Sequence, residues 1–245
     1  MFERLIEFIP LSIIEIMVQH KRELSDKERI TQITFMAGLN IRKRKTEKPV
    51  IVAIIGLVGS GKSSVAQELA TRIGATVIEG DAIRVGLRKQ KESYEKTWVI
   101  AENVAVEVAK QGGNVVLDSD FVRTEKRASI REKAHKAGVR LVFICTYCDP
   151  YVMFGRMITA TYRDKIDDFF GGAESKWQGS EQSKGAAVKI HEMWRRTPHH
   201  YRWVKGGGKW AIKNPPCAVL ADIDTTDKSS WKREVDECVK KLRAL

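Results

Sequence analysis

The spacing of hydrophobic residues changes character at about residue 49. Before that point, apolar side chains recur at steps of three and four, which is typical of amphipathic helices; the positions are Leu5, Ile6, Ile9, Ile13, Ile14 and Met17. Pro10 divides this run into two pieces, because proline interrupts helical hydrogen bonding. Ser25 and Glu28 form an S-x-x-E capping box and Gly38 supplies a stop, so a second helix is predicted between them.

From Pro49 onward, short apolar runs alternate with longer helical patterns. The apolar runs are VIVAIIG (50–56), ATVIEG (75–80), NVVLDSD (114–120), VRLVFICTY (139–147) and CAVLADID (217–224). Helices are predicted from Lys62, over about 94–111 and 124–137, and from about 227. Uniformly apolar runs fit parallel strands that are covered on both faces. We therefore expect an α/β fold with a doubly wound, five-stranded parallel sheet, while residues 162–214 receive no clear assignment.

Composition is that of a soluble globular protein. With 245 residues, 43% of them apolar, the chain is long enough for one large domain or a domain with an appendage. The best candidate for a membrane helix or signal peptide, residues 5–18, contains two glutamates and a proline and lacks a basic start and a cleavage site. We therefore expect a cytoplasmic location. The C-x-x-C of Cys145 and Cys148 is interpreted as two reduced strand residues, since four cysteines make no disulfide framework.

Positive charge is concentrated in two segments. The formal net charge is +12, of which residues 42–48 contribute +4 (five Lys or Arg less one Glu) and residues 193–221 contribute +6 (six Lys or Arg, no acid). Such a field attracts phosphate-rich partners. The first segment is interpreted as a solvated linker. This divides the chain into an N-terminal helical segment with a basic linker (1–45) and a main domain (46–245).

The stretch GLVGSGKSS, at 56–64, carries the candidate chemistry. It matches G-x-x-x-x-G-K-[ST] at every fixed position, with a predicted strand before it and an amphipathic helix after it. Glycines let backbone amides turn toward phosphates, Lys62 reaches the β- and γ-phosphates, and the Ser63 hydroxyl is a ligand for Mg²⁺. We therefore expect ATP and Mg²⁺ to bind here. The expected contacts are Gly56, Gly59, Ser60, Gly61, Lys62, Ser63 and Ser64.

A phosphate loop alone leaves the reaction open. A GTPase would need an N-K-x-D stretch, which the chain lacks, and transporter or motor ATPases carry a strand ending in D-E, where this chain has VVLDSD. Asp81 follows the second predicted strand, at the edge where open α/β sheets bind ligands, and its carboxylate can accept the proton of an attacking hydroxyl. Arg84, one helical turn later, can bind an anion on the acceptor. The alternative for Asp81 is a helix N-cap.

Three stretches, GLVGSGKSSVA, VIEGDAIRVGL and NVVLDSD, resemble the P-loop kinases that include polynucleotide 5′-hydroxyl kinases, adenylylsulfate kinases and zeta-toxin-like kinases. The resemblance covers roughly residues 50–160 and the last strand and helix. It implies that Asp81 is the general base, that Arg84 binds an acceptor phosphate, and that Asp118 orients Mg²⁺ or the acceptor. Asp120 is a rival for the role of Asp118. In adenylylsulfate kinases the second stretch reads D-G-D-N-x-R, of which this chain keeps only part.

The stretch DPYVMFGRMITATYRDK resembles the lid entrance of these kinases, so we expect a lid over about 151–214. The resemblance implies that Arg156 or Arg163 clamps the transferring phosphoryl group; a solvated helix face is the alternative. Residues 191–213 interleave basic and aromatic side chains, which suits a single-stranded nucleic acid and equally suits an arginine-rich lid packed on the core. No metal is assigned to His191, His199 and His200, because no matching carboxylate or cysteine set accompanies them.

Three functions remain open at the level of sequence. The leading hypothesis is an ATP- and Mg²⁺-dependent phosphotransferase whose acceptor hydroxyl belongs to a nucleic acid 5′ end or a nucleotide-like metabolite. The alternatives are a P-loop ATPase or GTPase that drives a partner, and a nucleotide-binding regulatory protein acting through its N-terminal helices. Those helices either cover a sheet edge of the same domain or present an apolar face to a partner or second subunit. No membrane contact is expected.

Overall fold

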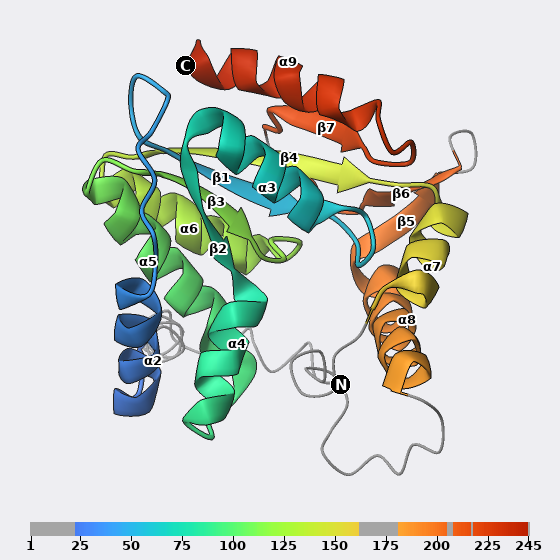
Figure 1. Cartoon of the computed structure of the whole chain (residues 1–245), viewed down its shortest axis with the longest axis horizontal. Helices are drawn as coiled ribbons and strands as arrows, with labels where there is room; N and C mark the ends of the chain where they lie inside the picture. The colour runs from blue at the N-terminus through green and yellow to red at the C-terminus, as the bar shows by residue number, and fades with distance from the viewer. Residues whose placement is uncertain (1–22, 162–180, 205–207, 217, 245) are drawn as a thin grey trace, which may run out of the picture.

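The predicted strands form one parallel sheet in the computed structural model, which describes residues 23–161, 181–204, 208–216 and 218–244 (Figure 1). The sheet order is β2-β3-β1-β4-β7, with β1 Val50–Ile55, β2 Ala75–Glu79, β3 Asn114–Asp118, β4 Arg140–Tyr147 and β7 Ala221–Asp224. The helices are α2 Asp26–Ala37, α3 Lys62–Ile73, α4 Gly80–Lys89, α5 Thr97–Lys110, α6 Thr124–Lys136, α7 Pro150–Thr159, α8 Glu181–His200 and α9 Trp231–Arg243, with a 3₁₀ turn, η2, at Tyr94–Lys96. The five-stranded α/β prediction is confirmed.

Two hydrophobic cores sandwich the sheet, and β1 supplies both. Its alternate residues Ile51, Ala53 and Ile55 pack with α5 and α6, whereas Val50, Val52 and Ile54 pack with α3 and α9. Every β1 side chain is buried. This is why the run reads as continuously apolar: a strand covered on both faces has no solvent side on which polar residues could alternate.

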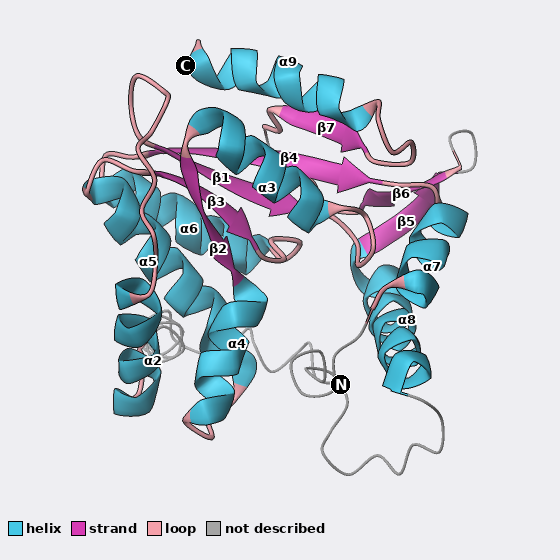
Figure 2. Ribbon diagram, in the orientation of Figure 1, coloured by secondary structure: helices cyan, strands magenta, loops and turns pink. Residues whose placement is uncertain are grey.

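Parallel register brings the carboxyl ends of the strands to one edge. Glu79 of β2 lies beside Asp118 of β3, and Tyr147 of β4 lies beside Asp224 of β7. Figure 2 shows the arrowheads of β1 and β4 pointing toward α7 and a two-stranded hairpin. Since β3 and β4 flank β1 on opposite sides, the loop after β1 lies at the point where the connections diverge. Ligands of open α/β sheets bind at that point.

The described part of the N-terminal segment lies on the main domain. The predicted capping box is confirmed: Glu28 N–H donates to Ser25 Oγ at 3.2 Å and Ser25 N–H donates to Glu28 Oε2 at 2.7 Å. Helix α2 packs against α4 and α5, not against a sheet edge (Figure 1). The earlier predicted helical run falls in residues 1–22, outside the described residues.

The basic linker is only partly the solvated connection that its charge predicts. Its side chains are exposed, but its main chain is fastened to the domain. Arg42 N–H donates to Thr76 Oγ1 at 3.2 Å, and Lys45 N–H donates to the Ile73 carbonyl at 2.8 Å. Arg44 also donates to the Gly112 carbonyl at 2.8 Å. The basic linker is therefore a segment bound to the domain through its main chain, with its charged side chains exposed to solvent.

The expected lid region contains α7, α8 and an antiparallel hairpin of β5 (Tyr201–Val204) and β6 (Lys209–Ile212). The sequence did not predict this hairpin. Cys145 and Cys148 are free thiols, but the expectation of two buried strand residues is only partly met, since Cys145 on β4 is half-buried and the buried Cys148 follows the end of β4. In the part of the chain that the structure describes, no helix combines the length and apolarity needed to span a bilayer.

Candidate active site

The phosphate loop connects β1 to α3 and is built on glycines that adopt left-handed conformations. Gly59 has φ +82° and Gly61 has φ +80°, a region that disfavours residues with a Cβ. Gly61 is the N-cap of α3, which begins at Lys62. Amides at a helix N-terminus have no intrahelical partner, so this end of α3 can donate hydrogen bonds to a phosphate.

Lys62 folds over the loop. Its ammonium donates to the carbonyl oxygens of Gly56 at 2.9 Å and Leu57 at 2.8 Å. Burial lowers the pKa of Lys62, while the negative charges of Asp120, Asp118 and Asp81 oppose that shift and Arg196 reinforces it. Four charged groups from three separate parts of the chain therefore act on this ammonium. Ser63 and Ser64, in the first turn of α3, are exposed.

The Ser60 side chain connects the phosphate loop to β4. This side chain is 1% exposed, and its hydroxyl is 2.8 Å from the Thr146 hydroxyl on β4. Gly56 lies against the same pair, since a Cβ built there would be 2.2 Å from Thr146 Oγ1 and 2.4 Å from Ser60 Oγ. The Ser60 side chain thus faces the sheet and not the side of the loop where a nucleotide would bind. The expected contact of Ser60 with the nucleotide therefore stays a prediction, and it concerns the main-chain amide.

Gly56→Ala is expected to destabilise the fold by about 1–3 kcal/mol and to abolish tight ATP binding, because the added methyl overlaps a buried hydroxyl pair. Urea unfolding and titration with a fluorescent ATP analogue measure the two effects. The matched control is Gly155→Ala in α7, where a Cβ meets no atom within 4 Å. That variant should gain up to about 1 kcal/mol from helix propensity. An unfolding midpoint for Gly56→Ala equal to that of the wild type would contradict the expected clash.

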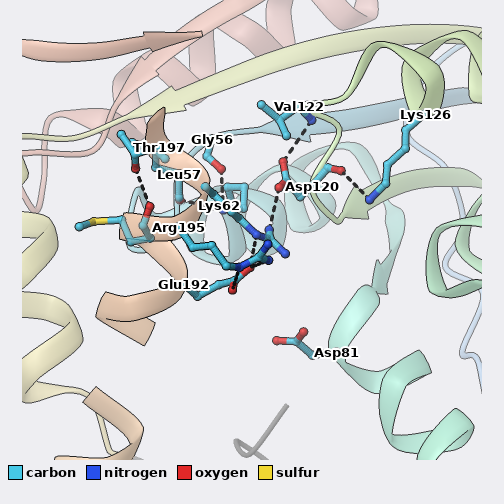
Figure 3. A network of polar contacts seen from close by, with 12 residues as sticks. Gly56, Leu57, Lys62, Asp81, Asp120, Val122, Lys126, Glu192, Arg195 and Thr197 are labelled. Carbon is cyan, nitrogen blue, oxygen red and sulfur yellow. Dashed lines mark hydrogen bonds and ion pairs between the residues drawn. The ribbon is translucent and has the colours of Figure 1, made fainter. Parts of the chain in front are cut away.

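Asp81 and Arg84 lie in the first turns of α4, directly after β2. They form an ion pair with each other. The Asp81 side chain is 54% exposed and that of Arg84 is 20% exposed, so the carboxylate is open to solvent at the edge of the sheet. Figure 3 shows Asp81 projecting from α4 toward the group around Lys62 and Glu192. The structure therefore places the expected base on the same side as the phosphate loop.

The two aspartates after β3 differ in their contacts. Asp120 accepts hydrogen bonds from Val122 N–H at 3.1 Å and from Arg196 at 2.8 Å. The carboxylate of Asp118, the last residue of β3, makes no hydrogen bond or ion pair with the described residues. Mg²⁺ that is bound to nucleotide phosphates takes only one or two protein ligands. The available Asp118 carboxylate and the exposed Ser63 hydroxyl fit such an ion.

Among the described residues, no group of three or more His, Cys, Asp or Glu side chains is arranged to hold a metal ion.

Arg196 was not among the expected active-site residues. It extends from α8, pairs with Glu192 on the same helix and with Asp120 across the site, and is 25% exposed. Glu192 also binds Arg195 at 2.8 Å. Burial acts to raise the pKa of Glu192, but the hydrogen bonds and charges of the two arginines outweigh it and leave that pKa below its ordinary value. An ionised Glu192 thus holds Arg196 beside Asp120.

Of the two arginines expected to clamp the phosphoryl group, Arg156 and Arg163, the structure describes only Arg156. Arg156 donates to Thr225 Oγ1 at 3.0 Å and contacts Cys148 Sγ at 3.3 Å, while Thr225 Oγ1 donates to the Ser60 carbonyl at 3.0 Å. Arg156 is therefore tied to the backbone that supports the phosphate loop. Arg163 lies outside the described residues, so its role stays a prediction.

Comparisons with known proteins agree with this architecture. Residues 51–159 match a family model described as an AAA domain. The APS kinase CysC of Mycobacterium tuberculosis, solved in complex with AMPPNP and APS, is 20% identical, with a TM-score of 0.51 over 80% of this chain and 98% of that chain. The protein APE1195 is 17% identical, with a TM-score of 0.53 over 83% of this chain and 99% of that chain. No curated protein matches the sequence. At identities this low, the structural matches show a shared fold.

Proposed function

We propose that this chain, which has the fold of the P-loop kinases, transfers the γ-phosphoryl group of ATP to an acceptor hydroxyl. The observation that carries the proposal is the set of charges around Lys62. Asp81, Asp118, Asp120 and Arg196 come from the ends of β2 and β3 and from α8, and all four act electrostatically on this ammonium. Phosphoryl transfer depends mainly on positioning and on such charge stabilisation, which supports a transferase at this edge of the sheet.

Each residue has a distinct part in the proposed reaction. The amides of the loop and Lys62 hold the ATP phosphates, and Asp81 receives the proton of the acceptor hydroxyl. The acceptor oxygen forms a bond to the γ-phosphorus while the bond from that phosphorus to the β–γ bridging oxygen breaks, so ADP leaves. Arg196 neutralises charge on the transferring group. Ser63 and Asp118 would hold Mg²⁺, which would supply further neutralisation of charge on the phosphate oxygens.

Arg84 is the proposed anchor for the acceptor. Its guanidinium pairs with the carboxylate of Asp81. A phosphate or sulfate group on the acceptor would compete for the guanidinium and release the Asp81 carboxylate to face the incoming hydroxyl. This coupling favours an acceptor that carries its own anion near the reacting hydroxyl, as nucleic acid ends and nucleotide-like metabolites do.

Exposed aromatic residues near the lid support a nucleic acid acceptor. The exposed fraction is 65% for Trp194 on α8 and 44% for Trp203 on β5, and the neighbouring Arg202 is exposed as well. Aromatic faces that stack on bases, combined with arginines that bind phosphates, are typical of single-strand binding surfaces. We therefore place 5′-hydroxyl oligonucleotides first among the acceptors to be tested.

Incubation with γ-labelled ATP, Mg²⁺ and a panel of acceptors tests the proposal. The panel contains 5′-hydroxyl oligonucleotides, nucleosides, adenylylsulfate, sugars and small alcohols. We expect label on one acceptor class, and for an oligonucleotide we expect KM to rise steeply with salt as phosphate contacts are screened. Label that appears only as free phosphate with every acceptor would instead indicate an ATPase.

A further inference from the structure

Helix α2 lies outside residues 51–159, the region that matches the AAA domain model, yet it packs on the helix that carries the proposed base. In Figure 1, α2 stands beside α4 and α5 on the same side of the sheet. Apolar side chains of the N-terminal region, Leu24, Phe35, Met36 and Leu39, join the core that contains Ile83 and Leu87 of α4. This addition to the fold is therefore integrated with α4.

Gly86 of α4 lies against Thr31 of α2. A Cβ at that position would be 2.8 Å from the Cγ2 methyl of Thr31, which is 3% exposed. The Thr31 hydroxyl donates to the Lys27 carbonyl at 3.1 Å, and this bond fixes the rotamer that directs the methyl at α4. The methyl cannot rotate away without breaking that bond. The missing side chain of Gly86 thus permits the approach of α2.

Polar contacts hold α2 at the neighbouring elements as well. Asn103 of α5 donates to Gln32 at 2.8 Å, and the Lys96 ammonium donates to the Glu23 carbonyl at 2.6 Å. Lys27 lies 4.0 Å from Glu92, just beyond the end of α4. These contacts come from α5, from η2 and from the segment just after α4, so α2 is held on the elements around α4 and limits how far that helix can tilt.

We propose that α2 is a positioning element for the acceptor site and that Thr31 is its positioning residue. Asp81 and Arg84 sit in the first turns of α4, five and two residues before Gly86 on the same rigid helix. A displacement at Gly86 therefore moves both side chains relative to Lys62. Misplacement of a reacting group by about 1 Å lowers rates by about 10². The consequence for acceptor binding rests on the proposed function, whereas the hold of α2 on α4 does not.

Three variants of the full chain test the inference. Gly86→Ala introduces the clash, Gly86→Ala with Thr31→Ser removes the opposing methyl while keeping the hydroxyl, and Gly155→Ala is a helix-interior control with open space. We expect Gly86→Ala to accelerate amide exchange in residues 80–89 by about tenfold. We also expect its KM for a 5′-hydroxyl oligonucleotide to rise about tenfold, while its affinity for ATP stays within about twofold, since the loop is on another element. The double variant should restore both values.

The outcomes separate this inference from the proposed function. The role of α2 is overturned if amide exchange in α4 is no faster in Gly86→Ala than in the Gly155→Ala control. It is also overturned if adding Thr31→Ser to Gly86→Ala does not restore the wild-type exchange rate and KM. Equal increases in KM for the oligonucleotide and for ATP overturn it too, because they would indicate a general loss of structure. If the wild type phosphorylates no acceptor, the proposed function fails, and the exchange measurement still decides whether α2 holds α4.

Discussion

Replacement of Asp81 by asparagine is expected to lower transfer of label from γ-labelled ATP to the acceptor by about 10²- to 10⁴-fold. Asparagine keeps the size of the side chain but cannot accept the proton of the attacking hydroxyl. It also loses the ion pair with Arg84, which then remains available to an anionic acceptor. Initial rates at saturating ATP measure the loss, which should appear in kcat while ATP affinity changes by less than about threefold.

The chain contains a matched control for this variant. Asp26 also lies in the first turn of a helix and faces an arginine three residues later, Arg29, at 3.9 Å, but its side chain is 97% exposed and lies on α2. Asp26→Asn therefore repeats the chemical change away from the phosphate loop and should leave the rate unchanged. Wild-type transfer rates in Asp81→Asn would remove Asp81 from the mechanism.

Local sequence patterns predicted most of what forms the frame of the site. Three features that depend only on residues close in sequence have the structures predicted for them. They are the strand in the run 50–56, the capping box of Ser25 and the glycine–lysine loop. The β5–β6 hairpin escaped prediction because its strands are only four residues long and half-exposed, so their alternation is weak. Trp203 and Trp210 pack edge to face across the hairpin, with their ring centroids 5.2 Å apart. This contact becomes evident only once the two strands are known to pair.

Long-range contacts account for what the sequence left undecided. Arg196 and Asp120 are separated by 76 residues, and no spacing rule joins them. A local signal did exist, since Glu192 and Arg196 are four residues apart on one helix face, which favours an ion pair. Similarly, the capping box of Ser25 and Glu28 and the stop at Gly38 predicted the helix between them but not the helices that it packs against. Gly86 inside a helical pattern was the available hint of a close approach.

Arg196→Gln is the second variant with a large expected effect, a decrease in kcat of about 10³-fold. Glutamine retains hydrogen-bonding groups but carries no charge, so it cannot neutralise the transferring phosphoryl group. Asp120 would also lose the cation 2.8 Å from its carboxylate. Single-turnover transfer from γ-labelled ATP measures the chemical step, and binding of an ATP analogue measured separately should weaken by less than about tenfold, because the loop and Lys62 hold the ground state.

Two other arginines of the same region distinguish this role from a general need for positive charge. Arg195 shares Glu192 with Arg196, but it is 57% exposed and pairs with no aspartate in the described part of the chain, so Arg195→Gln should retain nearly the full rate. Arg156 hydrogen-bonds Thr225 beneath the phosphate loop, so Arg156→Gln should lower the unfolding midpoint and ATP affinity together while single-turnover chemistry at saturating ATP survives. A loss of chemistry in Arg156→Gln alone would assign the clamp to α7 instead of α8, because Arg156 lies on α7 and Arg196 lies on α8.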